Sequence, residues 1–454
     1  MNPRLNQLYE AQFSEEENRG YIQTSTLILL AFASAYFSRV LDTLGFPSFI
    51  NFAHFATIPL ACWIALTKSR SKDPQQLTTS WMLFAGLFIF LWVMFASALL
   101  NDAGIINVIV NFLLFGEPFI LALTMTCVPM NPERVSWFRK WVIRFGFCNL
   151  IWATAQYILF VQLKMHPKYW NPDYIQGIFY ESGAGHVVGS SVALTFGLYY
   201  WVSEKNAPLW KRILPLVWGF WQMLVSDSKQ VMLFLFMGAG LLIMTKFASI
   251  VEAIKWLIGG FLAAYGLLFC AQNIPACSAF NTWARPEIYG PDGEATLLKT
   301  ASIRIISSHM TTPLHHLFGL GPGHTVGRLG GWMIREYEHL LGPLGVTSHP
   351  ATFETWQAVM NSWLGDQSSM FSPLWGWAGI WGDTGWLGLA SYLFLGYVVW
   401  AYLCKDDFCR FTILSVASCG FIFSQMEEPG YTLFITMIIM IRWHEHRAKE
   451  QLNI

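Results

Sequence analysis

The feature that most constrains the fold is a series of apolar runs that recur along most of the chain. Each run is about 20 residues long, enough for a helix to cross a hydrocarbon core of roughly 30 Å. The chain is 54% hydrophobic and only 12% charged, whereas soluble domains carry about 25% charged residues. Backbone groups in lipid must be paired within their own segment, so helix is the expected state. We therefore predict an all-α polytopic membrane protein.

The runs predict twelve transmembrane helices, and Lys and Arg are concentrated in every second connection between them. When the N-terminus is placed in the cytoplasm, most of the 28 Lys and Arg residues lie on the inner side. Inner connections are expected to be enriched in these residues, so both termini are predicted to be cytoplasmic. The predicted spans are 22–40, 46–67, 79–100, 104–127, 141–163, 186–203, 211–226, 229–246, 253–273, 382–403, 408–425 and 429–443.

The chain is predicted to form a single membrane domain, 1–454, with one large external loop at 274–381, between spans nine and ten. A connection of that length is too long to be passive. Part of the loop is expected to be helical at 297–312, with Ile303, Ile306 and Met310 on one face. The formal net charge is zero, so the sequence indicates no basic surface for nucleic acid.

The loop contains the stretch LHHLFGLGPGHT, residues 314–325, in which Gly319, Gly321 and Gly323 predict a tight turn. Such a turn can bring backbone N–H groups close to a phosphate. The stretch lies on the outer side and lacks the GKS or GKT ending, which excludes a nucleotide-binding P-loop. Its adjacent histidines point apart and no acidic ligand follows at a suitable spacing, so no metal site is predicted.

Three charged residues outside that stretch are candidates for function. Arg304, in the outer loop, can pair bidentately with a diphosphate or be an ordinary solvated charge. Lys229, at the outer end of a span, can serve a site, extend to the interface, or pair with Asp227. Glu117 lies within a span, where a carboxylate is costly unless protonated or paired. It can be structural or face a cavity, and Pro118 suggests a local break in its helix.

Four motifs within about residues 180–395 together resemble the O-antigen polymerase and ligase superfamily. In chain order the motifs are GIFYESGAG (177–185), SDSKQVMLFL (226–235), SIRIISSHMTTPLHHLFGLGPGHT (302–325) and WGDTGWLGLASYL (381–393). In the second motif Lys229 stands where Arg is usual in the family. The third motif is an Arg followed after about ten residues by a Gly-rich turn, and in the fourth Asp383 replaces a Glu.

The resemblance implies roles for residues at the matched positions. Arg304 and Lys229 would bind the diphosphate of the substrate, and the Gly-rich turn and Glu181 would shape the pocket. The His of the ligase branch is absent here, near Leu374. The general base is therefore open among three residues of the outer loop that can accept a proton from a sugar hydroxyl. These candidates are His324, His349 and Asp366.

The implied activity is a glycosyltransferase that needs no metal and no cofactor. It would polymerise polyprenyl-diphosphate-linked oligosaccharide repeat units into surface polysaccharide (O-antigen, capsule or exopolysaccharide) on the outer face of the plasma (inner) membrane. Its partners would be the lipid-linked glycan, the bilayer, and a chain-length regulator and flippase of the same pathway. The alternatives are a ligase that transfers the glycan to another acceptor, a polysaccharide transporter, and a non-catalytic assembly protein.

Overall fold

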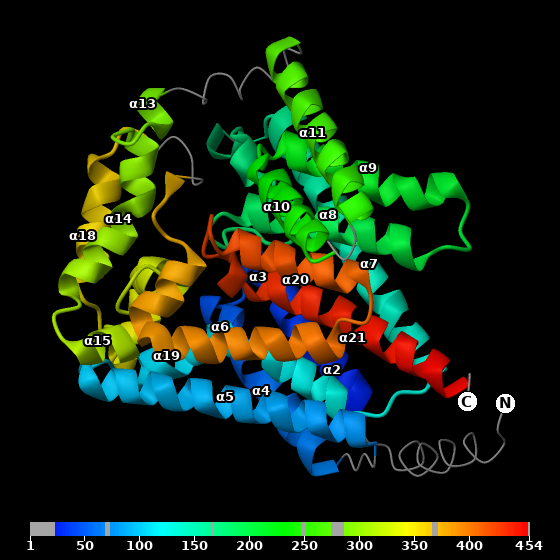
Figure 1. Ribbon diagram of the computed structural model, residues 1–454, viewed down its shortest axis with the longest axis horizontal. Helices are drawn as coiled ribbons and strands as arrows, with labels where there is room; N and C mark the ends of the chain where they lie inside the picture. Colours follow the sequence, from blue (N-terminus) through cyan, green and yellow to red (C-terminus); the bar gives the residue numbers. More distant parts are fainter. Residues whose placement is uncertain are drawn as a thin grey trace.

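The computed structural model describes residues 23–68, 73–165, 167–246, 250–273, 286–365 and 371–452. Within these ranges every regular element is a helix, and each of the predicted apolar segments contains one (Figure 1). The helices of the main bundle are α2 (Thr24–Tyr36), α3 (Ser38–Thr43), α4 (His54–Lys68), α5 (Pro74–Leu100), α6 (Ile105–Cys127), α7 (Pro132–Gln156), α8 (Gly185–Ser203), α9 (Leu209–Val225), α10 (Gln230–Met244), α11 (Ile250–Asn273), α19 (Gly376–Val398), α20 (Asp407–Cys419) and α21 (Pro429–Leu452).

Five helical stretches of the described chain are long and apolar enough to cross a membrane. Helices α2 and α10 are apolar but shorter. The described helices thus agree with the prediction of a helical membrane protein. The predicted number of twelve spans and their orientation stay predictions. The five stretches are Ser48–Lys68, Pro74–Leu100, Ile105–Cys127, Pro132–Gln162 and Gly376–Leu403.

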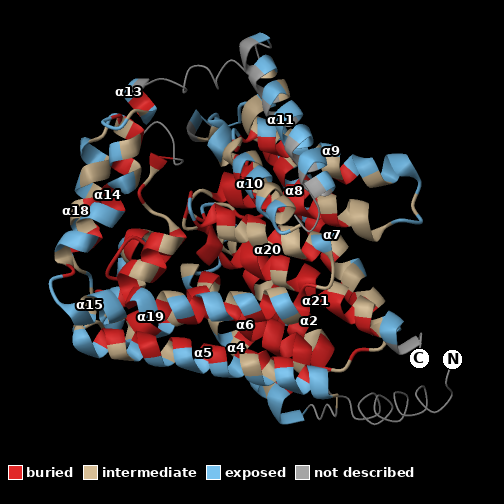
Figure 2. Cartoon of the chain, in the orientation of Figure 1, coloured by how far each residue is buried: buried red, intermediate tan, exposed pale blue. Residues whose placement is uncertain are grey.

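Helix α21 runs through the centre of the bundle and packs on α2, α6, α7, α8 and α20 (Figure 1). Its side chains are buried around most of its circumference, including Phe434, Met437 and Ile438, and the red band in Figure 2 follows it. A helix that is apolar all round is expected to be enclosed by its neighbours. Helix α19 packs along α5 and α20 packs along α10, so these two helices have different principal neighbours.

One end of the bundle gathers basic residues into ion pairs. Arg442 pairs with Asp406 at 2.5 Å, and Lys246 pairs with Asp407 at 2.6 Å. Arg139 lies 3.4 Å from Glu445. These residues belong to the end that the charge pattern predicts to be cytoplasmic.

Residues 286–365 form a cap of short helices beside the bundle (Figure 1). Within it α14 packs on α18, while α15 packs on α19 of the bundle. The cap helices are α13 (Pro286–Tyr289), α14 (Glu294–His309), α15 (Pro313–Phe318), α16 (Ile334–Glu336), α17 (Glu338–Leu341) and α18 (Pro350–Asn361).

Three local predictions need correction. Ile306 and Met310 of α14 are buried, but Ile303 is 41% exposed, because the buried face of the helix runs through Ala301, Ser302 and Ile306 instead. Helix α6 continues through Pro118 without a break.

The third correction concerns helix α19, which begins at Gly376 and therefore inside the segment predicted to be an external loop. Its first N–H groups are satisfied, since Gly376 donates to the carbonyl of Phe423 at 2.9 Å and Trp377 to that of Gly420 at 3.3 Å. The helix is interrupted at Gly385, whose φ of 63° and ψ of −163° are not helical.

Candidate functional site

The Gly-rich turn wraps around a carboxylate of the protein itself, that of Asp383 on α19. The backbone N–H groups of Gly323 and Thr325 donate to it at 2.8 and 3.0 Å. The hydroxyl of Thr325 donates at 2.7 Å and the amide of Asn111 at 2.9 Å. Asp383 is fully buried. The N–H groups that could have bound a phosphate therefore already bind an anion, and the third and fourth sequence motifs meet here.

Glycine is required where this turn meets the break in α19. Gly319 has φ of 78°, and a Cβ there would lie 2.4 Å from the carbonyl carbon of Asp383. A Cβ on Gly385 would lie 2.4 Å from the carbonyl carbon of Leu317. The two backbones thus touch directly, which only glycine permits on either side.

Just after the turn, Arg328 enters the protein interior and is only 6% exposed. Its guanidinium forms an ion pair with Glu428 and donates to the carbonyl of Ser182 at 3.2 Å. Its backbone N–H donates to Glu427 at 2.6 Å. Arg328 therefore joins the cap to the first sequence motif and to the start of α21.

Glu427 lies in the connection between α20 and α21 and is fully buried. Burial raises the pKa of this carboxyl well above its usual range, although the N–H of Arg328 opposes the shift. The neighbouring Glu428 is the carboxylate that forms the ion pair with Arg328.

The indole of Trp332 brings a second arginine to the same place. The guanidinium carbons of Arg328 and Arg39 lie 4.8 and 5.8 Å from its ring centroid. Arg39 also lies 5.9 Å from the ring of Tyr337. Arginine stacks readily on aromatic faces, and its planar fork matches phosphate oxygens. Nη2 of Arg328 is engaged by Glu428 and Ser182, so the candidate anion-binding group consists of the other N–H groups of Arg328 together with Arg39.

Next to the arginines, His54 at the start of α4 is paired with Glu117 of α6. The imidazole Nδ1 lies 2.9 and 2.8 Å from the two carboxylate oxygens, and both side chains are buried. With Glu117 ionised and the imidazole neutral, Nδ1 is the donor to the carboxylate and Nε2 is the acceptor. This is the geometry of a general base oriented by a carboxylate.

The two arginines, Trp332 and His54 line one small cavity, which we call the arginine pocket. Its volume is about 30 Å³, room for about two water molecules. It can therefore admit the reacting atoms of a ligand but not a whole sugar. Its polar and aromatic lining includes Arg39, Asn51, His54, Arg328, Trp332 and Glu428.

The residues predicted to bind the diphosphate lie apart from the lining of this pocket. Arg304 is exposed on α14, where its Nη2 donates to the carbonyl of Leu297 at 2.9 Å. Lys229 pairs locally with Asp227 at 2.9 Å. Glu181 adopts a positive φ of 52°, and its N–H donates to the side chain of Gln176 at 2.6 Å.

Two of the three predicted bases are brought together in the cap. His324 and His349 stack with ring centroids 5.7 Å apart. The ring nitrogens of His324 are engaged by the carbonyl of Leu320 at 2.9 Å and the hydroxyl of Thr347 at 2.8 Å. Asp366 lies outside the described residues. In the part of the chain that the structure describes, no group of three or more His, Cys, Asp or Glu is placed to hold a metal ion.

The cap should lose stability as the pH falls, because His349 must be neutral in the folded state. Burial and the neighbouring His324 and His309 lower its pKa to about 4, from about 6.5 in an unfolded chain. A depressed histidine pKa gives stability that is present above about 6.5 and lost as the pH falls toward 4. The thermal unfolding midpoint of the purified protein should decrease over that range.

His349→Asn is the matched variant for this measurement. His349 caps α18 by accepting from the N–H of Ala351 at 3.1 Å, and asparagine is a good N-cap that does not titrate. The variant should flatten the pH dependence between pH 6.5 and 4. An unchanged slope would show that His349 is not the group responsible.

Sequence reasoning missed Arg39, His54, Arg328 and Glu428. One signal was available: MEEPG places two adjacent carboxylates directly before the last apolar run. Comparisons with protein-family models, with curated proteins and with solved structures found no match.

Proposed function

We propose that the chain is a membrane glycosyltransferase that polymerises polyprenyl-diphosphate-linked oligosaccharide repeat units on the outer face of the plasma membrane. The twelve helical segments cross the bilayer, with both termini in the cytoplasm. The basic ion pairs at one end of the bundle support this orientation. In this orientation the arginine pocket, which residues of the cap help to line, lies toward the outer side.

The observation that carries the proposal is the arginine pocket itself. It combines an oriented imidazole with two guanidinium groups on one indole. Glycosyl transfer from a lipid diphosphate needs both, a base for the acceptor hydroxyl and positive charge for the leaving diphosphate. The motifs that resemble the O-antigen polymerase and ligase superfamily support the same reaction class.

In the proposed reaction, Nε2 of His54 takes the proton from a hydroxyl of the acceptor repeat unit. The hydroxyl oxygen bonds to the anomeric carbon of the donor as the bond from that carbon to the diphosphate oxygen breaks. The electron pair of the broken bond stays on the diphosphate, next to Arg328 and Arg39. Glu117 stabilises the imidazolium that forms on His54. The protons and electrons balance without a metal or cofactor.

His54→Gln is expected to lower the rate of polymer formation by about 100- to 10,000-fold, the usual contribution of a general base. Glu117→Gln should lower it less, because the imidazole remains but loses its orienting charge. The assay is purified protein with lipid-linked repeat units, with the products resolved by length on a gel. His316→Gln, at an exposed histidine of α15, is the matched control and should retain full activity.

Each outcome of this assay has a meaning. If His54→Gln makes polymer at the normal rate, His54 is not the base, and His324 and His349 become the variants to compare. If the unaltered protein moves single units onto a different acceptor, it is a ligase. If it moves lipid-linked units across vesicles without forming bonds, it is a transporter.

A further inference from the structure

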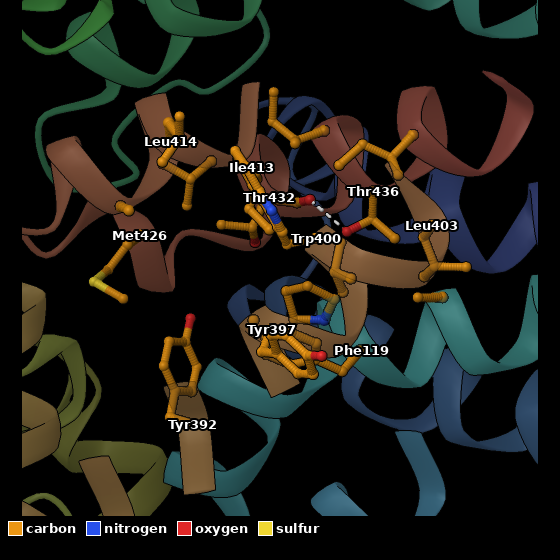
Figure 3. A pocket seen from close by; sticks show the side chains of 18 of the residues that line it. Phe119, Tyr392, Tyr397, Trp400, Leu403, Ile413, Leu414, Met426, Thr432 and Thr436 are labelled. Atoms are coloured by element: carbon orange, nitrogen blue, oxygen red, sulfur yellow. Dashed lines mark hydrogen bonds between the residues drawn. The ribbon is translucent and has the colours of Figure 1, made fainter. Parts of the chain in front are cut away.

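An apolar groove lies between α19 and α20, with α6 and α21 as its floor (Figure 3). Its volume is about 340 Å³, within the range of about 300–1,000 Å³ in which proteins hold small ligands. We call it the α19–α20 groove. Its walls include Phe119, Tyr392, Trp400, Leu403, Ile413 and Met440.

The hydroxyl groups of α21 in this groove are engaged within their own helix. Thr436 donates to the carbonyl of Thr432 at 2.9 Å, the contact drawn as a dashed line in Figure 3. Thr432 donates to the carbonyl of Glu428 at 3.0 Å. The protons of both hydroxyls are thus used, so this wall is suited to a hydrocarbon rather than to a polar ligand.

The groove is open along one side. Leu393 and Tyr397 of α19 line it and are 52% and 56% exposed. In the described part of the chain α19 packs along α5 and α20 along α10, and the groove between them is unfilled. In a membrane protein such an exposed apolar face contacts lipid, so a lipid chain can enter the groove sideways.

The short segment 426–432, which ends the α20–α21 connection and begins α21, separates the groove from the arginine pocket. Met426 and Thr432 line the groove, whereas Glu428 lines the arginine pocket and pairs with Arg328. Thr432 lies one helical turn from Glu428. A ligand with a charged head and a long apolar tail could therefore contact both sites across this segment.

We propose that the α19–α20 groove holds the isoprenoid tail of the lipid diphosphate whose head binds Arg328 and Arg39. This inference rests on the proposed function for the identity of the head. It places the lateral entry of the lipid between α19 and α20.

Gly396 offers a direct test, because it lines the groove and a Cβ there would meet nothing within 4 Å. Gly396→Phe should fill the groove without a backbone clash. Its affinity for radiolabelled undecaprenyl diphosphate, measured on full-length protein in phospholipid nanodiscs, should fall about tenfold or more. Isopentenyl diphosphate, with the same head and only a five-carbon tail, should bind almost as before.

Gly240→Phe is the matched control, since a Cβ on Gly240 of α10 also meets nothing within 4 Å and the residue is not part of the groove. It should leave both affinities unchanged. Ala417→Leu, on the opposite wall of the groove, should weaken the long-chain lipid like Gly396→Phe. The thermal unfolding midpoint of each variant shows whether it is folded.

The outcomes separate this inference from the proposed function. If Gly396→Phe and Ala417→Leu bind undecaprenyl diphosphate normally, the groove does not hold its tail, even when Arg328→Lys weakens both diphosphates. If Arg328→Lys weakens neither diphosphate, the assignment of the head fails, while the long-chain lipid can still depend on Gly396. If the unaltered protein retains radiolabelled phosphatidylglycerol as well as it retains undecaprenyl diphosphate, the groove binds ordinary bilayer lipid and the inference is overturned.

Discussion

Arg328→Lys is expected to give a folded protein that forms no long polymer. Lysine keeps the positive charge beside the buried Glu428, so the ion pair survives and the fold is retained. A single ammonium cannot provide a planar fork to a diphosphate, and it stacks less well on Trp332 than the guanidinium does. Binding and polymer formation should therefore be lost together. The measurements are the length distribution of the product and the thermal unfolding midpoint.

Removing the charge altogether should have a different effect. Arg328→Met leaves Glu428 buried without its partner, and breaking a buried pair in this way costs about 3–5 kcal/mol. The double variant Arg328→Met with Glu428→Gln removes both charges and should recover most of that stability while remaining inactive. If the double variant recovers polymer formation as well, Arg328 is only structural.

Arg304 is the alternative candidate for binding the diphosphate. The resemblance of the sequence motifs implies this role for Arg304, whereas the proposal based on the arginine pocket assigns it to Arg328. Arg304→Ala and Arg328→Lys should be compared in the same assay. Loss of polymer in Arg304→Ala alone would favour the motif-based role, and the proposed pocket would then be wrong.

Asp383→Ala is expected to destabilise the protein by about 4 kcal/mol or more, among the largest effects of single substitutions. The change leaves the buried N–H groups of Gly323 and Thr325, the Thr325 hydroxyl and the Asn111 amide without their acceptor. Each buried donor left unpaired costs about 1–3 kcal/mol. Thermal and denaturant unfolding of the purified protein measure the loss.

Two variants make this result specific. Asp383→Asn keeps one oxygen acceptor and should lose less stability than Asp383→Ala. Asp407→Ala removes an exposed carboxylate that pairs with Lys246, and exposed pairs contribute about 0–1 kcal/mol. If Asp383→Ala is no more destabilising than Asp407→Ala, the carboxylate does not hold the turn.

The positions of the helices could be predicted because length and apolarity are local properties of the chain. The helical part of the loop was also predicted, although its buried face was not, since Ile303 is exposed. The site depends instead on contacts between distant residues. His54 and Glu117 are 63 residues apart in sequence, and nothing local to either shows that they meet.

Arg304 and Arg328 illustrate the same limit within one loop. Both are arginines near the Gly-rich turn, and the sequence alone gives no measure of which one the fold buries. The turn itself was predicted correctly as a turn, but its anion was not, because Asp383 comes from a helix that follows the loop. Only the tertiary structure shows that the N–H groups of the Gly-rich turn, which could have bound a phosphate, bind the carboxylate of Asp383 instead.

The seating of Asp383 in the Gly-rich turn has a mechanical consequence. The cap and the first part of α19, up to the break at Gly385, are held together by hydrogen bonds on a buried charge. These two parts should move as one rigid body, with Gly385 as the hinge that joins them to the rest of α19. Lifting the cap away from α19 would break these hydrogen bonds, so in the proposed polymerase the product would have to leave without a lid movement of the cap.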